Sequence, residues 1–192
     1  MLPKRLRGHN RAMNMERITI IGAGAWGTAL ATVARRAELD VILWAHEPET
    51  AEAINSGHEN TVFLPGIPLD KEIRATHDLG LAADAHAVLL ATPAQHLRAT
   101  AEALAPVLPP RTPVVICAKG IENKSGLLMG EVAREVLPEA PLAVLSGPTF
   151  AIEVAREQPA AVTLACGDAE IGKVLVSALG TRHFRPYFSN DV

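Results

Sequence analysis

The sequence predicts an α/β protein built on a doubly wound, mostly parallel sheet of the Rossmann type. Short apolar segments of strand type alternate with helical segments, and this order favours parallel strands joined by right-handed helical crossovers. The strand segments are apolar throughout rather than alternating, as in Ala87-Val88-Leu89-Leu90-Ala91, which is typical of a sheet covered by helices on both faces. A glycine-rich turn after the first strand is the third sign of this fold class.

The elements follow one another in a regular order. The β-branched run Ile18-Thr19-Ile20-Ile21 predicts the first strand, and similar apolar runs predict strands over residues 41–44, 74–76, 87–91, 114–117, 142–145 and 161–165. Helical spacing begins near Thr28 and predicts further helices over residues 48–54, 93–104, 126–137, 150–156 and 168–179. Two of these helices begin with proline, a residue favoured in the first turn. Residues 56–70 are rich in Gly, Asn and Pro and are expected to form a loop.

The composition is that of one globular domain that binds neither nucleic acid nor membranes. A chain of 192 residues can bury a sizeable core, and 48% hydrophobic residues exclude a disordered chain. The net charge of −3 is too small to indicate nucleic acid or an anionic membrane surface as a partner. No apolar run approaches the roughly 20 residues that cross a bilayer, so no membrane insertion is expected.

The cysteines and histidines indicate a reducing compartment and no metal. Cys117 and Cys166 stand far apart in apolar segments, so we expect buried, reduced thiols and a cytoplasmic protein. The seven histidines show no HxxxH pattern or carboxylate partner, which argues against a metal site. Residues 1–15 are basic but carry no apolar segment of a secretory signal. We interpret them as a disordered tail or a non-native start, with Met13 or Met15 as the natural first residue.

The turn Gly22-Ala23-Gly24-Ala25-Trp26-Gly27 matches the dinucleotide-binding fingerprint GxGxxG in its required context of strand, turn and helix. Gly22 permits the sharp turn, Gly24 lets a pyrophosphate approach bare backbone, and Gly27 lets the helix pack close to the strand. The helix start then presents unpaired N–H groups and partial positive charge to the phosphates. The alternative is a glycine-rich turn that only packs a helix on a sheet.

Other candidate residues stand at strand ends, where doubly wound sheets bind ligands. These ends are residues 22–27, 44–47, 91–95 and 118–122. Glu47 lies about 20 residues after the third glycine, where an acidic side chain holds the ribose 2′-OH of NAD. His46 beside it can donate to the 2′-phosphate of NADP, so the cofactor choice stays open. Lys119 follows a buried strand directly, where cofactor and an anionic substrate would meet; the alternative is a lysine that only reaches solvent.

A second unusual stretch is Ser146-Gly147-Pro148-Thr149-Phe150, again at a strand end. A Ser or Thr hydroxyl in this position can cap the following helix through its oxygen. Hydroxyls and free N–H groups at a helix start also suit a phosphate, and the two interpretations are compatible.

Five segments in order give the chain a family resemblance. They are GAGAWGTALA, ILWAHEPE, INSGHENTVFLPGIPL, CAKGIE and SGPTFAIEVA. The chain resembles the NAD(P)-dependent glycerol-3-phosphate dehydrogenases of the bacterial type from about Ile18 to its last residue. The resemblance implies reversible hydride transfer between NAD(P)H and dihydroxyacetone phosphate, giving sn-glycerol 3-phosphate for phospholipid synthesis.

The resemblance also implies roles for single positions. Trp26 and His46 match positions that contact the dinucleotide, and Ala151 matches a further cofactor contact. Lys119 matches a lysine that touches both cofactor and substrate. Two substrate-contacting positions of the family are matched by Gly147 and Thr149. We add Ala25, inside the glycine turn, and Pro93, at the end of the fourth strand, to the expected cofactor-binding residues.

One departure concerns the proton donor. In this family a catalytic lysine lies in a GGALKN motif at the start of a helical second domain, and the sequence contains no such motif. We therefore expect residues 16–188 to form the dinucleotide-binding domain and residues 189–192 to begin a linker to a helical substrate domain absent from this chain. The chain alone is expected to be inactive, and the full-length protein is a candidate homodimer.

Two alternatives remain at this point. The first is another two-domain NAD(P)-dependent dehydrogenase, of the 6-phosphogluconate or hydroxyacid type, against which the SGPTFA segment argues. The second is a non-catalytic module that senses a dinucleotide and regulates a partner.

Overall fold

One sheet of eight strands forms the centre of the computed structural model, which describes residues 15–192. The strands are β1 (Arg17–Ile21), β2 (Asp40–Trp44), β3 (Arg74–Thr76), β4 (Ala87–Leu90), β5 (Val114–Ile116), β6 (Leu142–Ser146), β7 (Ala160–Cys166) and β8 (Phe184–Ser189). Their order across the sheet is β3-β2-β1-β4-β5-β6-β7-β8. The direction of winding reverses between β1 and β4, so the predicted doubly wound sheet is confirmed. The interpretation of residues 1–15 falls, apart from Met15, outside the described residues.

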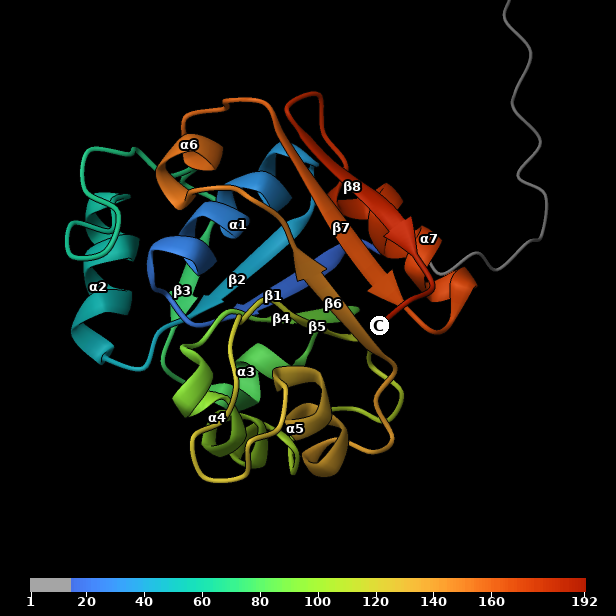
Figure 1. The fold of residues 1–192 in the computed structure, drawn as a ribbon. Helices are drawn as coiled ribbons and strands as arrows, with labels where there is room; N and C mark the ends of the chain where they lie inside the picture. Colours follow the sequence, from blue (N-terminus) through green and yellow to red (C-terminus); the bar gives the residue numbers. More distant parts are fainter. Residues whose placement is uncertain (1–14) are drawn as a thin grey trace, which may run out of the picture.

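Helices cover both faces of this sheet, as Figure 1 shows. They are α1 (Ala25–Arg36), α2 (Pro48–Gly57), α3 (Leu79–Ala83), α4 (Leu97–Leu104), α5 (Met129–Val136), α6 (Ala151–Ala155) and α7 (Ala169–Leu179), with a 3₁₀ turn η1 (Ala94–His96) before α4. Helices α1 and α6 pack against each other on one side, and α4 and α5 pack against each other on the opposite side. The sheet therefore lies between two helical layers.

The core divides into two clusters because successive strand residues face opposite sides. In β4, Leu89 belongs to the cluster under α1, whereas Val88 and Leu90 belong to the cluster under α4 and α5. All three side chains are fully buried. This is the reason why the strand sequences are apolar throughout instead of alternating.

The sheet is mostly parallel, and its exception is the antiparallel pair β6 and β7. The residues between these strands contain only α6, whose five residues extend about 7.5 Å. The five residues of β6 extend about 17 Å. A helix this short does not return the chain to the start of β6, so β7 runs back beside it. The expectation of parallel order fails here for that reason.

Several predicted boundaries shift. Helix α1 begins at Ala25 rather than near Thr28. Helix α5 begins at Met129, three residues after the predicted start at Gly126, because Gly126 has a φ of +74° that a helix does not allow. Helix α3 and strand β8 were not predicted from the sequence. Strand β8 escaped prediction because Pro186 in its middle argues against a strand.

Candidate functional site

The turn between β1 and α1 places two glycines where no side chain fits. Gly22 has a φ of +114°, and a Cβ on it would lie 3.0 Å from the backbone of Ala91 and Thr92. A Cβ on Gly27 would lie 1.8 Å from the carbonyl oxygen of Gly22. The first glycine therefore lets the chain after β1 lie against the backbone at the end of β4. The second lets the first turn of α1 lie directly against the glycine turn.

Gly24 has the opposite environment. A Cβ built on it would meet no atom within 4 Å, so the space beside this residue is open. Within residues 15–192, no group accepts a hydrogen bond from the backbone N–H of Gly24, Ala25 or Trp26. These N–H groups stand at the positive end of a 12-residue helix. Open space, free donors and positive potential together form a site that fits a phosphate group.

The end of β2 presents two accessible polar side chains. His46 and Glu47 are both exposed, and Glu47 is the N-cap residue of α2. The ring of Trp44 lies 5.9 Å from the His46 ring, and its indole Nε1 donates to the carbonyl of His77 at 3.0 Å. The indole therefore links the ends of β2 and β3 beneath His46.

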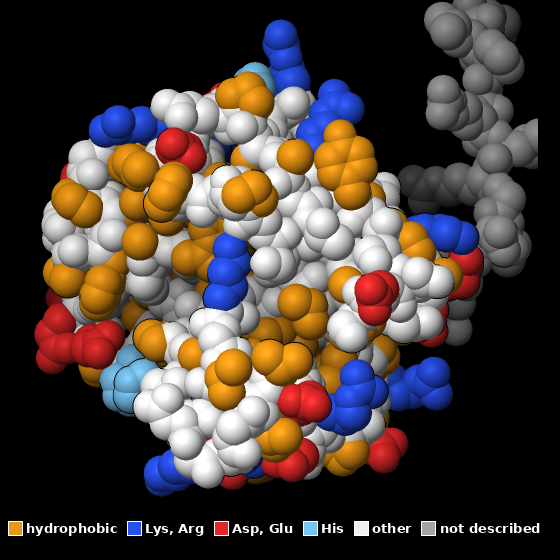
Figure 2. All heavy atoms as spheres, in the orientation of Figure 1, with side chains coloured by type: hydrophobic (Ala, Val, Ile, Leu, Met, Phe, Trp, Pro, Cys, Tyr) orange, Lys and Arg blue, Asp and Glu red, His pale blue; other side chains and the backbone are white. Residues whose placement is uncertain are grey.

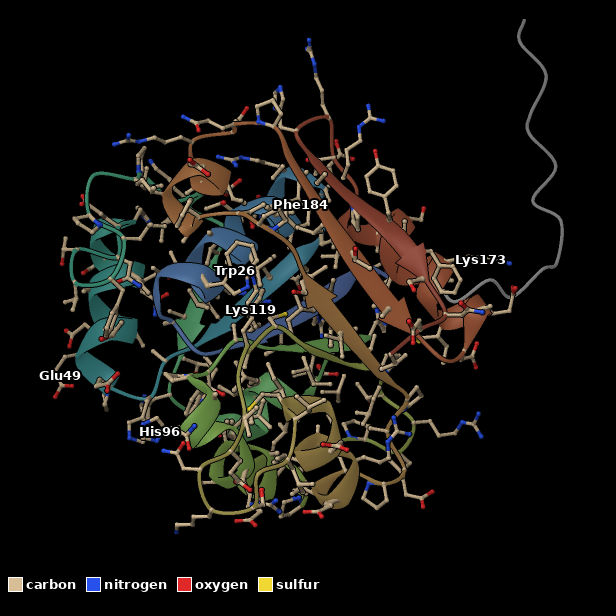
Figure 3. The ribbon with its side chains drawn as sticks, in the orientation of Figure 1. Trp26, Glu49, His96, Lys119, Lys173 and Phe184 are labelled. Carbon is tan, nitrogen blue, oxygen red and sulfur yellow. The ribbon has the colours of Figure 1, made fainter. Side chains whose placement is uncertain are left out.

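The ends of β5 and β6 come together through Lys119. Its ammonium donates to the carbonyl oxygen of Gly147 at 2.6 Å, and the side chain is exposed. An ammonium has three donors, so two remain for other partners. Gly147 is itself confined, since a Cβ on it would lie 2.7 Å from Cγ1 of Val162. Figure 3 shows Lys119 and Trp26 both near the centre of this face, and Figure 2 shows hydrophobic side chains around a basic side chain there.

The Ser146–Phe150 stretch does not act as the predicted helix cap. The N-cap residue of α6 is Phe150, and no side chain caps this helix. Thr149 is half-buried and Ser146 is exposed. Neither hydroxyl caps the helix, because the N-cap position is occupied by Phe150, whose side chain has no hydrogen-bond acceptor. The capping alternative is therefore wrong.

The remaining predicted residues border the same edge of the sheet. Ala151 is the first residue of α6, which packs against α1, and Ala151 lies against the same buried cluster as Ala25 and Trp26. Pro93 is exposed at the end of β4 and precedes η1. By contrast, His46 and Gly147 follow strands that are four places apart, about 19 Å at the usual strand spacing. They belong to opposite ends of the candidate site.

An ion-pair network that was not predicted from the sequence supports the Lys119 loop. The Glu122 carboxylate is 7% exposed and accepts hydrogen bonds at 2.9 and 3.2 Å from Nε of Arg98 on α4. The Arg98 guanidinium and the Ser125 hydroxyl hold the pKa of Glu122 below its usual value. Gln95 adds a bond to the carbonyl of Ile121 at 2.8 Å. In the sequence, only the KGIE segment, which ends at Glu122, indicated this network. Gln95 on η1 and Arg98 on α4, which complete it, belong to no recognisable motif.

A cavity of about 550 Å³ lies beside Lys119. Its lining combines the Lys119 loop and Ser146 with apolar side chains from the start of α5, including Leu128 and Met129. The exposed fraction of Leu128 is 58%. The cavity thus extends from the polar strand ends of β5 and β6 onto an apolar surface.

Residues 15–192 contain no reactive cysteine, no cluster of metal-ligating side chains and no helix suited to cross a membrane. Cys117 and Cys166 are free and buried, and burial raises the pKa of both thiols, which makes them poor nucleophiles. No group of three His, Cys, Asp or Glu side chains in the described region could hold a metal ion. None of the described helices has the length and apolar character needed to cross a membrane.

Comparison with known proteins gives a consistent result. The family model described as NAD-dependent glycerol-3-phosphate dehydrogenase N-terminus matches residues 17–172. The chain is 60% identical over 178 residues to glycerol-3-phosphate dehydrogenase [NAD(P)+] of Paramagnetospirillum magneticum and 59% identical over 179 residues to that of Rhodospirillum rubrum. It covers 65% and 51% of these two proteins, and they match 93% of the chain in each case. The chain thus spans between half and two-thirds of their length.

Solved structures agree with the sequence comparison. The crystal structure of glycerol-3-phosphate dehydrogenase from Coxiella burnetii superposes with a TM-score of 0.87 at 32% identity, covering 93% of this chain and 55% of that one. The enzyme from Saccharomyces cerevisiae superposes with a TM-score of 0.80 at 28% identity, covering 91% of this chain and 56% of that one.

Proposed function

The chain belongs to the family of NAD-dependent glycerol-3-phosphate dehydrogenases, and from this premise we propose that it binds NAD(H) or NADP(H) across the strand ends of β2, β1, β4 and β5. We propose further that the bound cofactor serves the interconversion of dihydroxyacetone phosphate and sn-glycerol 3-phosphate. The observation that carries the proposal is the turn at Gly24, where open space meets three unpaired backbone N–H groups. That turn receives the cofactor pyrophosphate.

The rest of the cofactor follows from the sheet order. Because β2 lies on one side of the turn and β4 and β5 on the other, an extended dinucleotide reaches from His46 and Glu47 to Lys119. The adenosine ribose lies at the end of β2, where Glu47 accepts from its hydroxyls. Pro93 and Trp26 border the middle of the cofactor, and Ala151 borders it from α6.

Lys119 stands where cofactor and substrate meet. When bound, the reduced nicotinamide supplies the hydride. The Lys119 ammonium keeps two donors beyond its bond to Gly147, and its charge stabilises the developing oxyanion of the ketone substrate. Gly147 and Thr149 supply backbone and hydroxyl groups to the substrate from the end of β6.

We infer that the acid that protonates this oxygen lies outside the candidate site. Lys119, at the point where cofactor and substrate would meet, is held by the Gly147 carbonyl, and Arg134, which also lines the cavity beside it, is a guanidinium that does not give up a proton at neutral pH. We propose that the catalytic lysine and the clamp on the substrate phosphate belong to a helical domain beyond residues 16–188, with residues 189–192 as the start of the connection. The complete protein acts in the cytoplasm as a homodimer and supplies sn-glycerol 3-phosphate for phospholipid synthesis.

Two measurements test this function. Calorimetry with NADH and NADPH on residues 1–192 should give binding to at least one of them. A turnover assay with dihydroxyacetone phosphate on the full-length gene product should show oxidation of the bound nucleotide. Binding without turnover by the full-length protein would favour a dinucleotide-sensing module, and absence of binding would refute the proposed site.

A further inference from the structure

Asn60 is a buried polar residue that the proposed function does not yet use. It lies in the loop after α2 and is 1% exposed. Its amide Nδ2 donates to the carbonyl oxygen of Ala23 and to the hydroxyl of Thr28, both at 2.8 Å. These two residues flank the turn that carries Gly24, so one side chain from a distant loop contacts both sides of the candidate phosphate site.

The orientation of the Asn60 amide is fixed by its own loop. The backbone N–H of Phe63 donates to Oδ1 of Asn60 at 3.1 Å, and the N–H of Leu64 donates to its carbonyl at 2.9 Å. Since Oδ1 is the acceptor for Phe63, the NH₂ group faces Ala23 and Thr28. Both of its hydrogens are used, and the buried amide is well satisfied.

The bond to Ala23 determines the direction of the next N–H group. In a trans peptide the C=O of one residue and the N–H of the following residue point in opposite directions. The Ala23 carbonyl points toward the buried Asn60 amide, so the Gly24 N–H points away from Asn60, and no group within residues 15–192 accepts a hydrogen bond from it. The Thr28 hydroxyl is a weak alternative partner for this carbonyl, at 3.5 Å.

We propose that Asn60 is a positioning residue for the cofactor pyrophosphate: by holding the carbonyl of Ala23, it keeps the Gly24 N–H directed at the phosphates. The inference rests on the proposed function, because it assumes that a dinucleotide binds at this turn. It adds to the glycine fingerprint a third segment, the loop after α2; without it, the Ala23 carbonyl keeps only the long bond from the Thr28 hydroxyl.

The test compares Asn60→Ala with Asn55→Ala on the intact chain. Asn55 is a matched control, since its amide also bridges backbone groups, donating to and accepting from Ala75 at 2.9 and 2.8 Å. We expect Asn60→Ala to weaken NADH binding roughly tenfold, the effect of losing one hydrogen bond from the Gly24 N–H to the phosphates. Binding of adenosine, which has no phosphate, should stay unchanged, and Asn55→Ala should bind both as the wild type does.

A second readout reports on the peptide itself. In the wild type, the Gly24 amide resonance should shift on addition of NADH, and in Asn60→Ala this shift should shrink. If Asn60→Ala does not fold, Thr28→Val and Thr28→Ser replace it: the serine keeps the acceptor for Nδ2 and should retain more NADH affinity than the valine. Equal NADH affinity of wild type and Asn60→Ala, equal losses for NADH and adenosine, or equal affinities of the two Thr28 variants would overturn the inference. Failure of the wild type to bind NADH would instead refute the proposed function, and this inference with it.

Discussion

Replacing Gly24 by valine should remove cofactor binding and leave the fold intact. The backbone of Gly24 has φ −70° and ψ −179°, an extended conformation that valine adopts without strain. A Cβ at this position meets no protein atom within 4 Å. The new side chain therefore occupies only the space where we place the pyrophosphate.

The size of the effect follows from the donors that the side chain blocks. Gly24, Ala25 and Trp26 offer three backbone N–H groups without a protein partner. Hydrogen bonds to a charged group contribute about 1.5–3 kcal/mol each, so the loss of two of them weakens binding by about 3–6 kcal/mol. At 1.4 kcal/mol per factor of ten, the affinity for NADH should fall more than about 100-fold. The unfolding temperature should stay within about 4 °C of the wild type.

Calorimetry and thermal unfolding of the same samples measure both quantities. Gly167→Val is the matched control, because a Cβ on Gly167 also meets nothing within 4 Å and this glycine follows β7, away from the turn. The control should bind NADH as the wild type does. Gly27→Ala gives the opposite result, loss of folding, since its Cβ would lie 1.8 Å from the Gly22 oxygen. Equal NADH affinity of wild type and Gly24→Val would refute the assignment of the turn as the cofactor site.

Three further outcomes are expected. His46→Ala should weaken NADPH binding about three- to tenfold more than NADH binding, because the imidazole can donate to a 2′-phosphate; an unchanged ratio of the two dissociation constants would make His46 a surface residue only. Residues 1–192 alone should not oxidise NADH with dihydroxyacetone phosphate, and turnover by this chain would contradict the proposed placement of the proton donor. In the full-length protein, Lys119→Ala should lower kcat/KM about 100-fold. Glu122→Gln should destabilise the fold at pH 7. Because Arg98 lowers the native pKa of Glu122, the carboxylate stabilises the protein above its unfolded pKa of about 4.3 and loses that effect as the pH falls through the native pKa. The difference in unfolding temperature between wild type and variant should therefore shrink below about pH 4, and a difference constant from pH 7 to pH 3 would contradict the ion pair.

Local signals predicted much of the fold. The apolar runs located seven of the eight strands, and proline or acidic residues located several helix starts, including Asp168 before α7. At Gly22 and Gly27 the pattern marks places where a Cβ would meet the backbone, of Ala91 and Thr92 in the first case and of Gly22 in the second, whereas Gly24 borders open space. Strand β8 was missed because Pro186 is acceptable only on the edge of a sheet, and edge position is a property of the whole sheet.

The sequence by itself determined the fold class, the glycine turn and the strand ends at which ligands bind, because these depend on backbone preferences and on the period of buried residues over short stretches. Only the tertiary structure decided which strand ends meet. The bond from Lys119 to Gly147 joins residues 28 positions apart, and the bond from Asn60 to Ala23 joins residues 37 positions apart. Such contacts form only once the order of the strands and the packing of the loops are set, and the reversal of β7 beside β6 shows how the length of one short helix sets that order.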